Sequence, residues 1–432
     1  MSVIRLDIAI VGAGISGLAA TRKVLSEMPG ARVAVFDRAD RPGGRPCSRD
    51  LGDGMGIVEL GAGRFSPNSH PQLASLTAHY GQATKSFEYR LTPIHSGLSE
   101  QAIILMSEIC NEIDKNYHST ELIQRHSISL RRAAVRIVGK ARFDLLVDLC
   151  GYDTLNHPDL TFEEGFRLLR QHPETSILFG RQDNNWRALV GGLSSLVDSL
   201  VEDLGGQAEL NLEHELVGIS TEGGGDHILH FETAYGQKAV CAGKVLFALP
   251  IWNSCRINGL NLPTMVCARI QSVPLIKAYF AYAERWWGDF GLEGRCLSTT
   301  SMFRKIYFPK DANYVLIYSD GTSANKLHES FVLDSDIHTT FLQMISDALP
   351  FGTEIAALPN PQDSDYRFWP HGISFWRNGL NLIPTGHWQI GQGAAVCSDL
   401  FTSKLGWIEG ALESAESAVR VLCENCISSP HN

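Results

Sequence analysis

The fold is decided by RLDIAIVGAGISGLAATRKVLSEMPGARVAVFD, which is residues 5–37. A short apolar run passes directly into Gly12-x-Gly14-x-x-Gly17, and a second apolar run ends in Asp37. Apolar runs of this length, separated by a stretch with helical spacing, are typical of two parallel strands joined by a helix. The sequence therefore predicts a βαβ unit, with the glycine pattern in the turn that opens its helix.

The three glycines have distinct physical roles in such a unit. Gly12 allows the tight turn, Gly14 lets a pyrophosphate approach the helix N-terminus, and Gly17 lets the helix pack closely on the strand. Asp37 is placed to accept hydrogen bonds from the hydroxyl groups of an adenosine ribose. We therefore expect a bound dinucleotide, and the alternative is a glycine-rich turn that binds no ligand.

Composition excludes several classes of function. The chain has 432 residues, of which 44% are hydrophobic and 19% charged, as is ordinary for a soluble globular protein of more than one domain. A net charge of -10 leaves no basic excess for binding nucleic acid. No apolar run reaches the length of a membrane helix, which is about 18 residues, and no signal peptide is recognisable. We therefore expect a cytoplasmic protein without nucleic-acid or membrane partners.

The ten cysteines are too few for a disulfide scaffold, and most of them lie in apolar runs. We expect them to be reduced and buried. Cys423 and Cys426 have C-x-x-C spacing, but no second pair accompanies them, so we interpret them as helix residues and expect no metal site.

A second glycine motif decides between FAD and NAD. Arg41-Pro42-Gly43-Gly44-Arg45 follows the acidic residue and resembles the second glycine motif of the flavin-dependent amine oxidase superfamily. Ser398-Asp399, followed by Gly406-Trp407-Ile408-Glu409-Gly410-Ala411, resembles the closing motif of the same superfamily. The resemblance implies that Asp399 holds the ribityl chain of an FAD and that the next helix begins at the pyrimidine end of the flavin, where a helix N-terminus stabilises negative charge.

The resemblance also implies a set of FAD contacts, drawn from the segments that match the superfamily motifs. These residues are Gly12, Gly14, Ser16, Gly17, Asp37, Arg38, Gly44, Arg45, Gly61, Ala62, Gly63, Arg64, Asp399, Trp407 and Ile408. The superfamily motif for covalent attachment, Ser-Gly-Gly-Cys-Tyr, has no counterpart near Cys397, so we expect non-covalent FAD. A second dinucleotide fingerprint is also absent from the sequence, because Gly391-x-Gly393 lacks a third glycine. We therefore expect the electrons to pass to oxygen.

The expected fold class is α/β, with a Rossmann-like FAD-binding domain of the amine oxidase type, an antiparallel-sheet substrate domain and an inserted helical domain. The FAD-binding domain is expected to be discontinuous, over residues 1–80, 186–250 and 385–432. Helical spacing places the helical domain at residues 81–185. Alternating apolar runs place the substrate domain at residues 251–384.

A third region narrows the resemblance. Glu59-Leu60-Gly61-Ala62-Gly63-Arg64-Phe65-Ser66-Pro67, with His70-Pro71, resembles L-amino-acid oxidases and most of all L-tryptophan oxidases. Further matching segments follow in the same order: Gln171-His172-Pro173-Glu174, Trp286-Trp287, Arg304-Lys305-Ile306-Tyr307-Phe308, Tyr318-Ser319-Asp320, Trp369-Pro370-His371-Gly372 and Cys397-Ser398-Asp399. Two segments depart from the resemblance: Leu405 replaces a small cysteine, and Phe375-Trp376 is bulkier than expected. The resemblance places both at the substrate pocket, so the preferred amino acid stays open.

Amino-acid oxidation requires an anchored carboxylate, a neutral amine and a dry flavin face. Arg64 is the candidate carboxylate anchor, because a guanidinium pairs with a carboxylate in bidentate fashion, and Tyr318 is the candidate second partner. Lys277 interrupts an apolar strand, and the resemblance implies that it holds a water beside the flavin. Trp407 is expected to form an aromatic wall, and His172 to close over the substrate. For each residue the alternative is a structural role, in packing or at the surface.

The sequence thus favours FAD-dependent oxidation of an uncharged hydrophobic or aromatic L-amino acid, of the Trp, Phe, Leu or Met type, to the 2-imino acid, with O2 reduced to H2O2. Two alternatives remain: an amine or polyamine oxidase acting on an amine without a carboxylate, and a non-catalytic FAD-binding protein. The expected partners are a small L-amino acid and O2. A homodimer and a downstream enzyme that uses the imine stay open.

Overall fold

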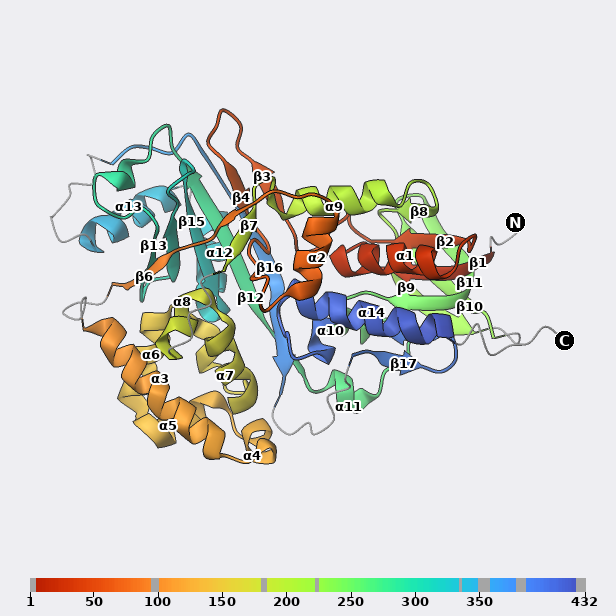
Figure 1. The fold of residues 1–432 in the computed structure, drawn as a ribbon, viewed down its shortest axis with the longest axis horizontal. Helices are drawn as coiled ribbons and strands as arrows, with labels where there is room; N and C mark the ends of the chain where they lie inside the picture. The colour runs from red at the N-terminus through yellow and green to blue at the C-terminus, as the bar shows by residue number, and fades with distance from the viewer. Residues whose placement is uncertain are drawn as a thin grey trace.

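The computed structural model describes residues 5–94, 101–179, 185–221, 225–333, 336–348, 358–377 and 386–424. Their secondary structure forms two large β-sheets, and a group of helices lies beside the second sheet (Figure 1).

The first sheet contains the glycine turn. Its strands are β1 (Arg5–Val11), β2 (Val33–Phe36), β8 (Ala208–Asn211), β9 (Glu215–Thr221), β10 (His227–Thr233), β11 (Gly236–Phe247), β17 (Trp388–Ile390) and β18 (Ala394–Val396). The order is β17-β18-β11-β1-β2-β8, and β10 pairs with β11 and with β9. β1 pairs in parallel with β2 and β11, and Val11 lies opposite Phe36 and Phe247. The carboxyl ends of these strands share one edge, which is where open α/β sheets bind ligands.

Helices pack on this sheet through one hydrophobic cluster. They are α1 (Ile15–Glu27), α2 (Pro71–His79), α9 (Gly192–Asp203) and α14 (Ile408–Glu424). α1 contacts both α9 and α14, and all three run alongside the sheet in Figure 1. The cluster includes Ile10 of β1, Leu18 of α1 and Val419 of α14, each with no more than a trace of exposed surface. Because the apolar positions of these helices recur at helical spacing, burial of one face holds each helix on the sheet.

The second sheet has the order β16-β12-β15-β14-β13-β6. Its strands are β6 (Arg90–Pro93), β12 (Ile270–Ala281), β13 (Arg295–Ser298), β14 (Lys305–Phe308), β15 (Tyr314–Asp320) and β16 (Asp363–Trp376). Neighbouring strands are antiparallel except β13 and β6, which are parallel. One face packs against α12 (Gly321–Leu333) and α13 (Ile337–Ala348) through residues such as Ile276, Val315 and Phe341. Because successive side chains of a strand point to opposite faces, Lys277, Tyr318 and Lys305 lie on the other face.

Two short ribbons connect these parts. β3 (Ser48–Asp50) pairs with β4 (Ile57–Glu59), and β5 (Thr84–Ser86) pairs with β7 (Arg187–Leu189). The sequence assigns residues 81–185 to a helical domain, but β6 within this segment is an edge strand of the second sheet. The first helix that the structure describes in the segment begins at Ala102.

The helical group comprises α3 (Ala102–Ser119), α4 (Leu122–Ser127), α5 (Leu130–Val138), α6 (Lys140–Cys150), α7 (Phe162–Gln171) and α8 (Pro173–Ser176), with the 3₁₀ turns η1 (Asp153–Asn156) and η2 (Ile177–Phe179). The helical spacing over residues 122–149 is divided among three of these helices. Ser129 caps α5 by accepting a hydrogen bond from the N–H of Arg132, and Gly139 has φ +83° between α5 and α6. The boundary between α4 and α5 and that between α5 and α6 therefore each have a local cause in the sequence.

The connection from β11 to β12 carries a disulfide that corrects one sequence-based expectation. It contains α10 (Ile251–Ser254) and α11 (Thr264–Cys267), and Cys255 is bonded to Cys267 with 5.7 Å between their Cα atoms. The expectation that every cysteine is reduced is therefore wrong for this pair, because the fold brings together two residues whose spacing carries no recognisable signal. Cys426 lies outside the described residues. The remaining short turns are η3 (Trp286–Gly288) and η5 (Asp399–Phe401).

The predicted fold class is confirmed: a parallel-stranded Rossmann-like part is joined to an antiparallel sheet and to helices. Among the described helices, none has both the length and the apolar character needed to cross a bilayer.

Candidate cofactor and substrate site

The glycine turn after β1 leaves no room for a side chain at Gly12 or Gly17. Gly12 has φ +110°, and a Cβ on it would lie 2.4 Å from the carbonyl oxygen of Ala248. A Cβ on Gly17 would lie 1.9 Å from the carbonyl oxygen of Gly12. Gly14, the N-cap of α1, has no atom within 4 Å of its Cβ position. Open space before a helix N-terminus, next to a turn that only glycine can make, fits the pyrophosphate of FAD.

The second glycine motif lies against the first. The N–H of Gly43 donates to the carbonyl oxygen of Ala13 at 2.8 Å, and Gly43 and Gly44 have φ values of +102° and +66°. A Cβ on Gly44 would lie 3.3 Å from Cα of Gly14. Because the two turns approach so closely, the second motif borders the same open space in front of the N-terminus of α1.

Asp37 follows β2 and is held beside the glycine turn. Its carboxylate accepts hydrogen bonds from the backbone N–H groups of Ala13 at 2.7 Å and Ala39 at 2.9 Å. Arg38 is exposed, and its guanidinium lies 3.7 Å from the carboxylate of Glu215. The fixed Asp37 carboxylate is therefore the better suited of the two to orient a ribose.

Asp399 joins its own segment to the second glycine motif, which is far away in the sequence. Its carboxylate accepts from the guanidinium of Arg45 at 3.3 Å and from the backbone N–H of Gly406 at 3.0 Å, and Ser398 donates to it at 3.3 Å. Only 5% of the Asp399 side chain is exposed. A buried carboxylate with charged and neutral donors around it fits a residue that receives the hydroxyl groups of a ribityl chain.

Lys277 of β12 reaches the Gly61–Arg64 segment. Its Nζ donates to the carbonyl oxygen of Gly61 at 2.6 Å and to that of Glu59 at 3.1 Å. Burial raises the pKa of the Glu59 carboxyl, against the opposing effects of Ser48, Leu193 and Lys277. The lysine is thereby fixed beside the segment that the sequence assigns to FAD.

Arg64 lies among polar and aromatic side chains. Its Nη1 donates to the hydroxyl of Tyr307 at 3.3 Å, its Nη2 lies 3.3 Å from Nδ1 of His172, and its guanidinium carbon lies 5.2 Å from the ring centre of Phe87. The hydroxyl of Tyr152 lies 2.9 Å from the same His172 nitrogen. A guanidinium can only donate, so Nδ1 of His172 is the acceptor in its contact with Arg64.

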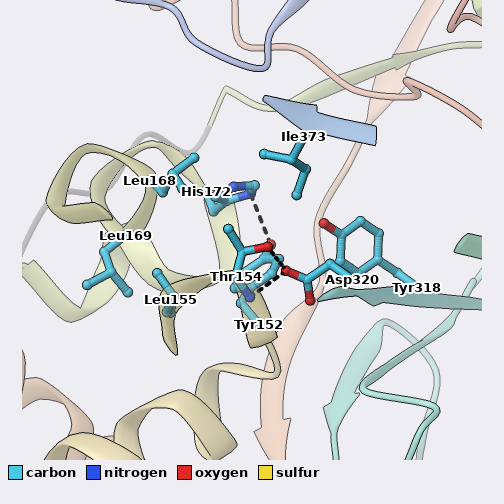
Figure 2. Close-up of a pocket in the computed structure, with 9 residues that line it drawn as sticks. All are labelled: Tyr152, Thr154, Leu155, Leu168, Leu169, His172, Tyr318, Asp320 and Ile373. Atoms are coloured by element: carbon cyan, nitrogen blue, oxygen red, sulfur yellow. Dashed lines mark hydrogen bonds between the residues drawn. The ribbon is translucent and has the colours of Figure 1, made fainter. Parts of the chain in front are cut away.

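A small pocket, with a cavity volume of about 20 Å³, adjoins these residues. Figure 2 shows it between α7, the segment of Tyr152 and Thr154, the end of β15 and Ile373 of β16. Its lining residues are Tyr152, Thr154, Leu155, Leu168, Leu169, His172, Tyr318, Asp320 and Ile373. The ring of Tyr318 meets that of Tyr152 edge to face, with 5.7 Å between their centres. His172 and Tyr318, two of the predicted site residues, thus line one pocket with four aliphatic side chains.

Asp320 adds a carboxylate to this pocket, although the sequence reading names no acidic residue there. It is fully buried and accepts hydrogen bonds from the N–H groups of Asp153 and Thr154, both at 2.9 Å, and from the Thr154 hydroxyl. Burial, followed by repulsion from Asp153, raises its pKa. Figure 2 shows the bonds from Thr154, which tie β15 to η1. With both oxygens engaged, Asp320 acts mainly as an anchor for the turn after Tyr152.

Trp407 stands among other rings just before α14. Its ring centre lies 4.6 Å from that of His70, 5.4 Å from that of Trp186 and 5.7 Å from that of His172. Aromatic side chains grouped in this way exclude water from the space that they border. The ring group also links Trp407 to His172, and through it to Arg64.

The helix starts named by the sequence are placed as follows. Ser16 and Ile408 are half-buried in the first turns of α1 and α14. The next residue, Glu409, is fully buried and accepts hydrogen bonds from the N–H groups of Gln72 and Leu73, each at 2.9 Å. It therefore caps α2 from another helix.

Three residues that the sequence places at the substrate pocket are buried and are not among the residues that line the pocket described above. They are Leu405, Phe375 and Trp376, each at most 2% exposed. Trp376 donates its indole N–H to the carbonyl oxygen of Leu400 at 2.9 Å. The aliphatic lining comes from α7, Leu155 and Ile373.

Sequence reasoning assigned no role to Tyr152, Tyr307 or Lys305, although all three lie at or beside this site. A signal existed for Lys305, because a lysine inside an apolar strand is the same pattern that singled out Lys277. Tyr152 follows a helix end and carried no such signal.

Comparison with known proteins identifies the group to which this chain belongs. The model of the NAD(P)-binding Rossmann-like domain matches residues 10–80, and that of the flavin containing amine oxidoreductase family matches residues 114–423. A flavin-dependent L-tryptophan oxidase, RebO of Lentzea aerocolonigenes, is 23% identical over 96% of this chain and 97% of its own length.

Solved structures agree with the fold. A putrescine oxidase variant superposes with a TM-score of 0.75 at 19% identity, covering 97% of this chain and 99% of that one. The cyclohexylamine oxidase of Brevibacterium oxydans gives a TM-score of 0.73 at 17% identity, covering 98% and 99%. Since the family model spans well over half of the sequence, the chain belongs to the flavin-containing amine oxidoreductases, a family of enzymes that oxidise amine-type substrates with FAD.

Proposed function

We propose that this protein is an FAD-dependent L-amino-acid oxidase for uncharged, hydrophobic or aromatic side chains. The amino acid loses two electrons and two protons, from Cα and the amine, to give the 2-imino acid, and O2 takes them up to give H2O2. The imino acid then hydrolyses to a 2-oxo acid and ammonia, unless another enzyme uses it first.

The observation that carries this proposal is the position of Arg64. Its guanidinium contacts His172 and Tyr307, and His172 lines the aliphatic pocket together with Tyr318. A guanidinium beside an apolar pocket supplies what a zwitterionic amino acid needs, namely a cation for the carboxylate and a dry space for the side chain. A simple amine has no group that would use Arg64.

The lining of the pocket supports the uncharged side chain. Leu155, Leu168, Leu169 and Ile373 offer no partner for a charge, and the Asp320 carboxylate already accepts bonds from Asp153 and Thr154. Burying an unpaired charge there would cost several kcal/mol. Lysine, arginine, glutamate and aspartate should therefore be poor substrates.

The remaining residues hold and shield the cofactor. Bound FAD supplies the two-electron acceptor chemistry. The glycine turns leave room for its pyrophosphate, Asp399 offers a carboxylate for its ribityl hydroxyls, and Trp407 excludes water. Cys397 is buried, which raises its thiol pKa to about 12, in keeping with a flavin held without a covalent bond. Acid precipitation should then release the yellow colour into the supernatant.

Oxidation of an amine without a carboxylate is the second candidate. The fold is shared with a putrescine oxidase and a cyclohexylamine oxidase, both named for amines, and at this identity the likeness extends only to the fold. Peroxide formation on the twenty L-amino acids, measured beside their decarboxylated amines, decides between the two. Turnover of amines but of no amino acid would refute our proposal.

A further inference from the structure

Lys305 of β14 is a fully buried lysine one layer behind the pocket. Its Nζ lies 3.3 Å from the ring centre of Tyr152, and its side chain has no exposed surface. An ammonium over an aromatic face is attracted by the ring, most strongly where water is excluded. Lys305 is absent from the pocket lining, so it reaches the substrate region through Tyr152.

The strand register places Lys305 in a row of polar residues. It lies opposite Tyr318 of β15, and Tyr318 lies opposite Lys277 of β12. Directly opposed residues in a sheet share a face. Both lysines therefore flank Tyr318 on the face away from α12 and α13.

Gly151 brings the Tyr152 ring to this lysine. It ends α6 in the left-handed conformation, with φ +67°, and a Cβ on it would lie 2.9 Å from the carbonyl oxygen of Arg304 and 3.1 Å from Cγ of Lys305. Only glycine allows both this conformation and this approach. The positive charge also reaches Cys150, where it opposes the rise in thiol pKa that burial causes.

Tyr152 connects Lys305 to Arg64, the candidate carboxylate anchor, through His172. Its hydroxyl lies 2.9 Å from Nδ1 of His172, and Nη2 of Arg64 lies 3.3 Å from the same atom. Rotation of the Tyr152 ring would therefore move Nδ1 of His172, which the Tyr152 hydroxyl and the Arg64 guanidinium both contact.

We propose that Lys305 is a positioning residue for carboxylate recognition: its ammonium fixes the Tyr152 ring, and Tyr152 fixes His172 and, through it, the orientation of Arg64. This inference rests on the proposed function. In this inference, Lys305 contributes to the preference for substrates with a carboxylate over simple amines. That role is separate from the role of Lys277, which lies beside the flavin segment.

The test compares Lys305→Met, which removes the charge, with Lys305→Arg, which keeps a cation over the ring. Ile306→Val is the matched control, because Ile306 is the next residue of β14, is equally buried and faces the opposite side. Each holoenzyme is assayed for FAD content and for kcat and KM on the preferred L-amino acid and on its decarboxylated amine.

We expect Lys305→Met to raise KM for the amino acid by at least about fivefold more than for the amine, as loss of a desolvated cation–π contact would. FAD content should stay unchanged, Lys305→Arg should restore most of the difference, and Ile306→Val should treat both substrates alike. Equal losses on the two substrates, or a Lys305→Arg variant as impaired as Lys305→Met, would overturn the inference.

A binding measurement separates this inference from the proposed function. Benzoate, a carboxylate that cannot be oxidised as an amine, is titrated into oxidised holoenzyme and followed by flavin absorbance. Weaker benzoate binding in Lys305→Met supports the inference, and an unchanged Kd overturns it. A wild-type enzyme that oxidises no L-amino acid overturns the proposed function instead.

Discussion

The Nζ atom of Lys277 lies 2.6 Å from the carbonyl oxygen of Gly61, so a strand of the antiparallel sheet is tied directly to the segment assigned to the flavin. The contact joins β12 of the second sheet to the loop that follows β4. It motivates the first prediction.

Lys277→Met should keep FAD bound but slow flavin reduction or reoxidation by at least about tenfold, which corresponds to about 1.4 kcal/mol of barrier. The glycine turns and Asp399 that hold the cofactor are unaffected by the change, whereas the cation beside the flavin segment is lost. Anaerobic stopped flow separates the two half-reactions. Wild-type rates in both would remove this lysine from the chemistry.

Arg64→Met should weaken binding of the amino acid by about 10- to 100-fold, since charge-assisted hydrogen bonds contribute about 1.5–3 kcal/mol. The decarboxylated amine should be affected far less. Flavin absorbance titrations measure both dissociation constants in the same variant. Equal weakening of the two ligands would place Arg64 outside the carboxylate site.

Ile373→Ala should shift preference toward larger side chains, because Ile373 lines the pocket. We expect the kcat/KM ratio of tryptophan to leucine to rise by about tenfold. Leu405→Ala is the control, as Leu405 is buried outside that pocket, and it should lower stability without changing the ratio. The opposite pattern would restore Leu405 as the residue that sets pocket size.

Glu409→Gln should lower the free energy of unfolding by about 1–3 kcal/mol, because one backbone N–H of α2 loses its buried acceptor. Glu413→Gln, one turn later in α14 and half-buried, is the matched control. Urea unfolding of the two holoenzymes gives the comparison. Similar losses in both variants would mean that the α2 cap contributes nothing specific.

His371 provides a pH-dependent test. Burial, assisted by the Arg256 and Arg38 charges, lowers its pKa, so below the ordinary value of about 6.5 the unfolded chain binds a proton that the folded chain does not. Its contribution to stability is therefore present above that pH and is lost as the pH falls. His371→Phe keeps a ring against Trp252. Urea unfolding between pH 7.5 and about 5 should show a shallower acid-side decline in the variant, and identical slopes would contradict the assignment.

The sequence was most informative where a residue type has one physical use. Gly12, Gly17 and Gly44 sit where a Cβ would collide or where φ is positive, and a motif records such constraints directly. Lys277 was recognisable because a lysine rarely interrupts an apolar strand. The glycine positions and Lys277 could be recognised because they depend on the local sequence around them.

What the sequence could not supply were contacts made by the packing of distant elements. Tyr152 meets Lys305 only because α6 ends against β14, and Cys255 meets Cys267 only because a loop returns on itself. The same limit applies to the pocket: Phe375 and Ile373 lie on one strand, and only the packed structure shows that Ile373 lines the pocket described above.

The strand order of the first sheet has a consequence for biosynthesis. In β1, Arg5 pairs with Cys241 of β11, and Val245 of β11 pairs with Ala394 of β18. During translation, β1 can pair with β11 only after more than half of the chain has been synthesised. Asp399 is synthesised later still. Such distant pairings make folding slow and leave apolar strands exposed to aggregation while the ribosome works. The site that we assign to FAD is thus complete only after Asp399 and α14 have been synthesised.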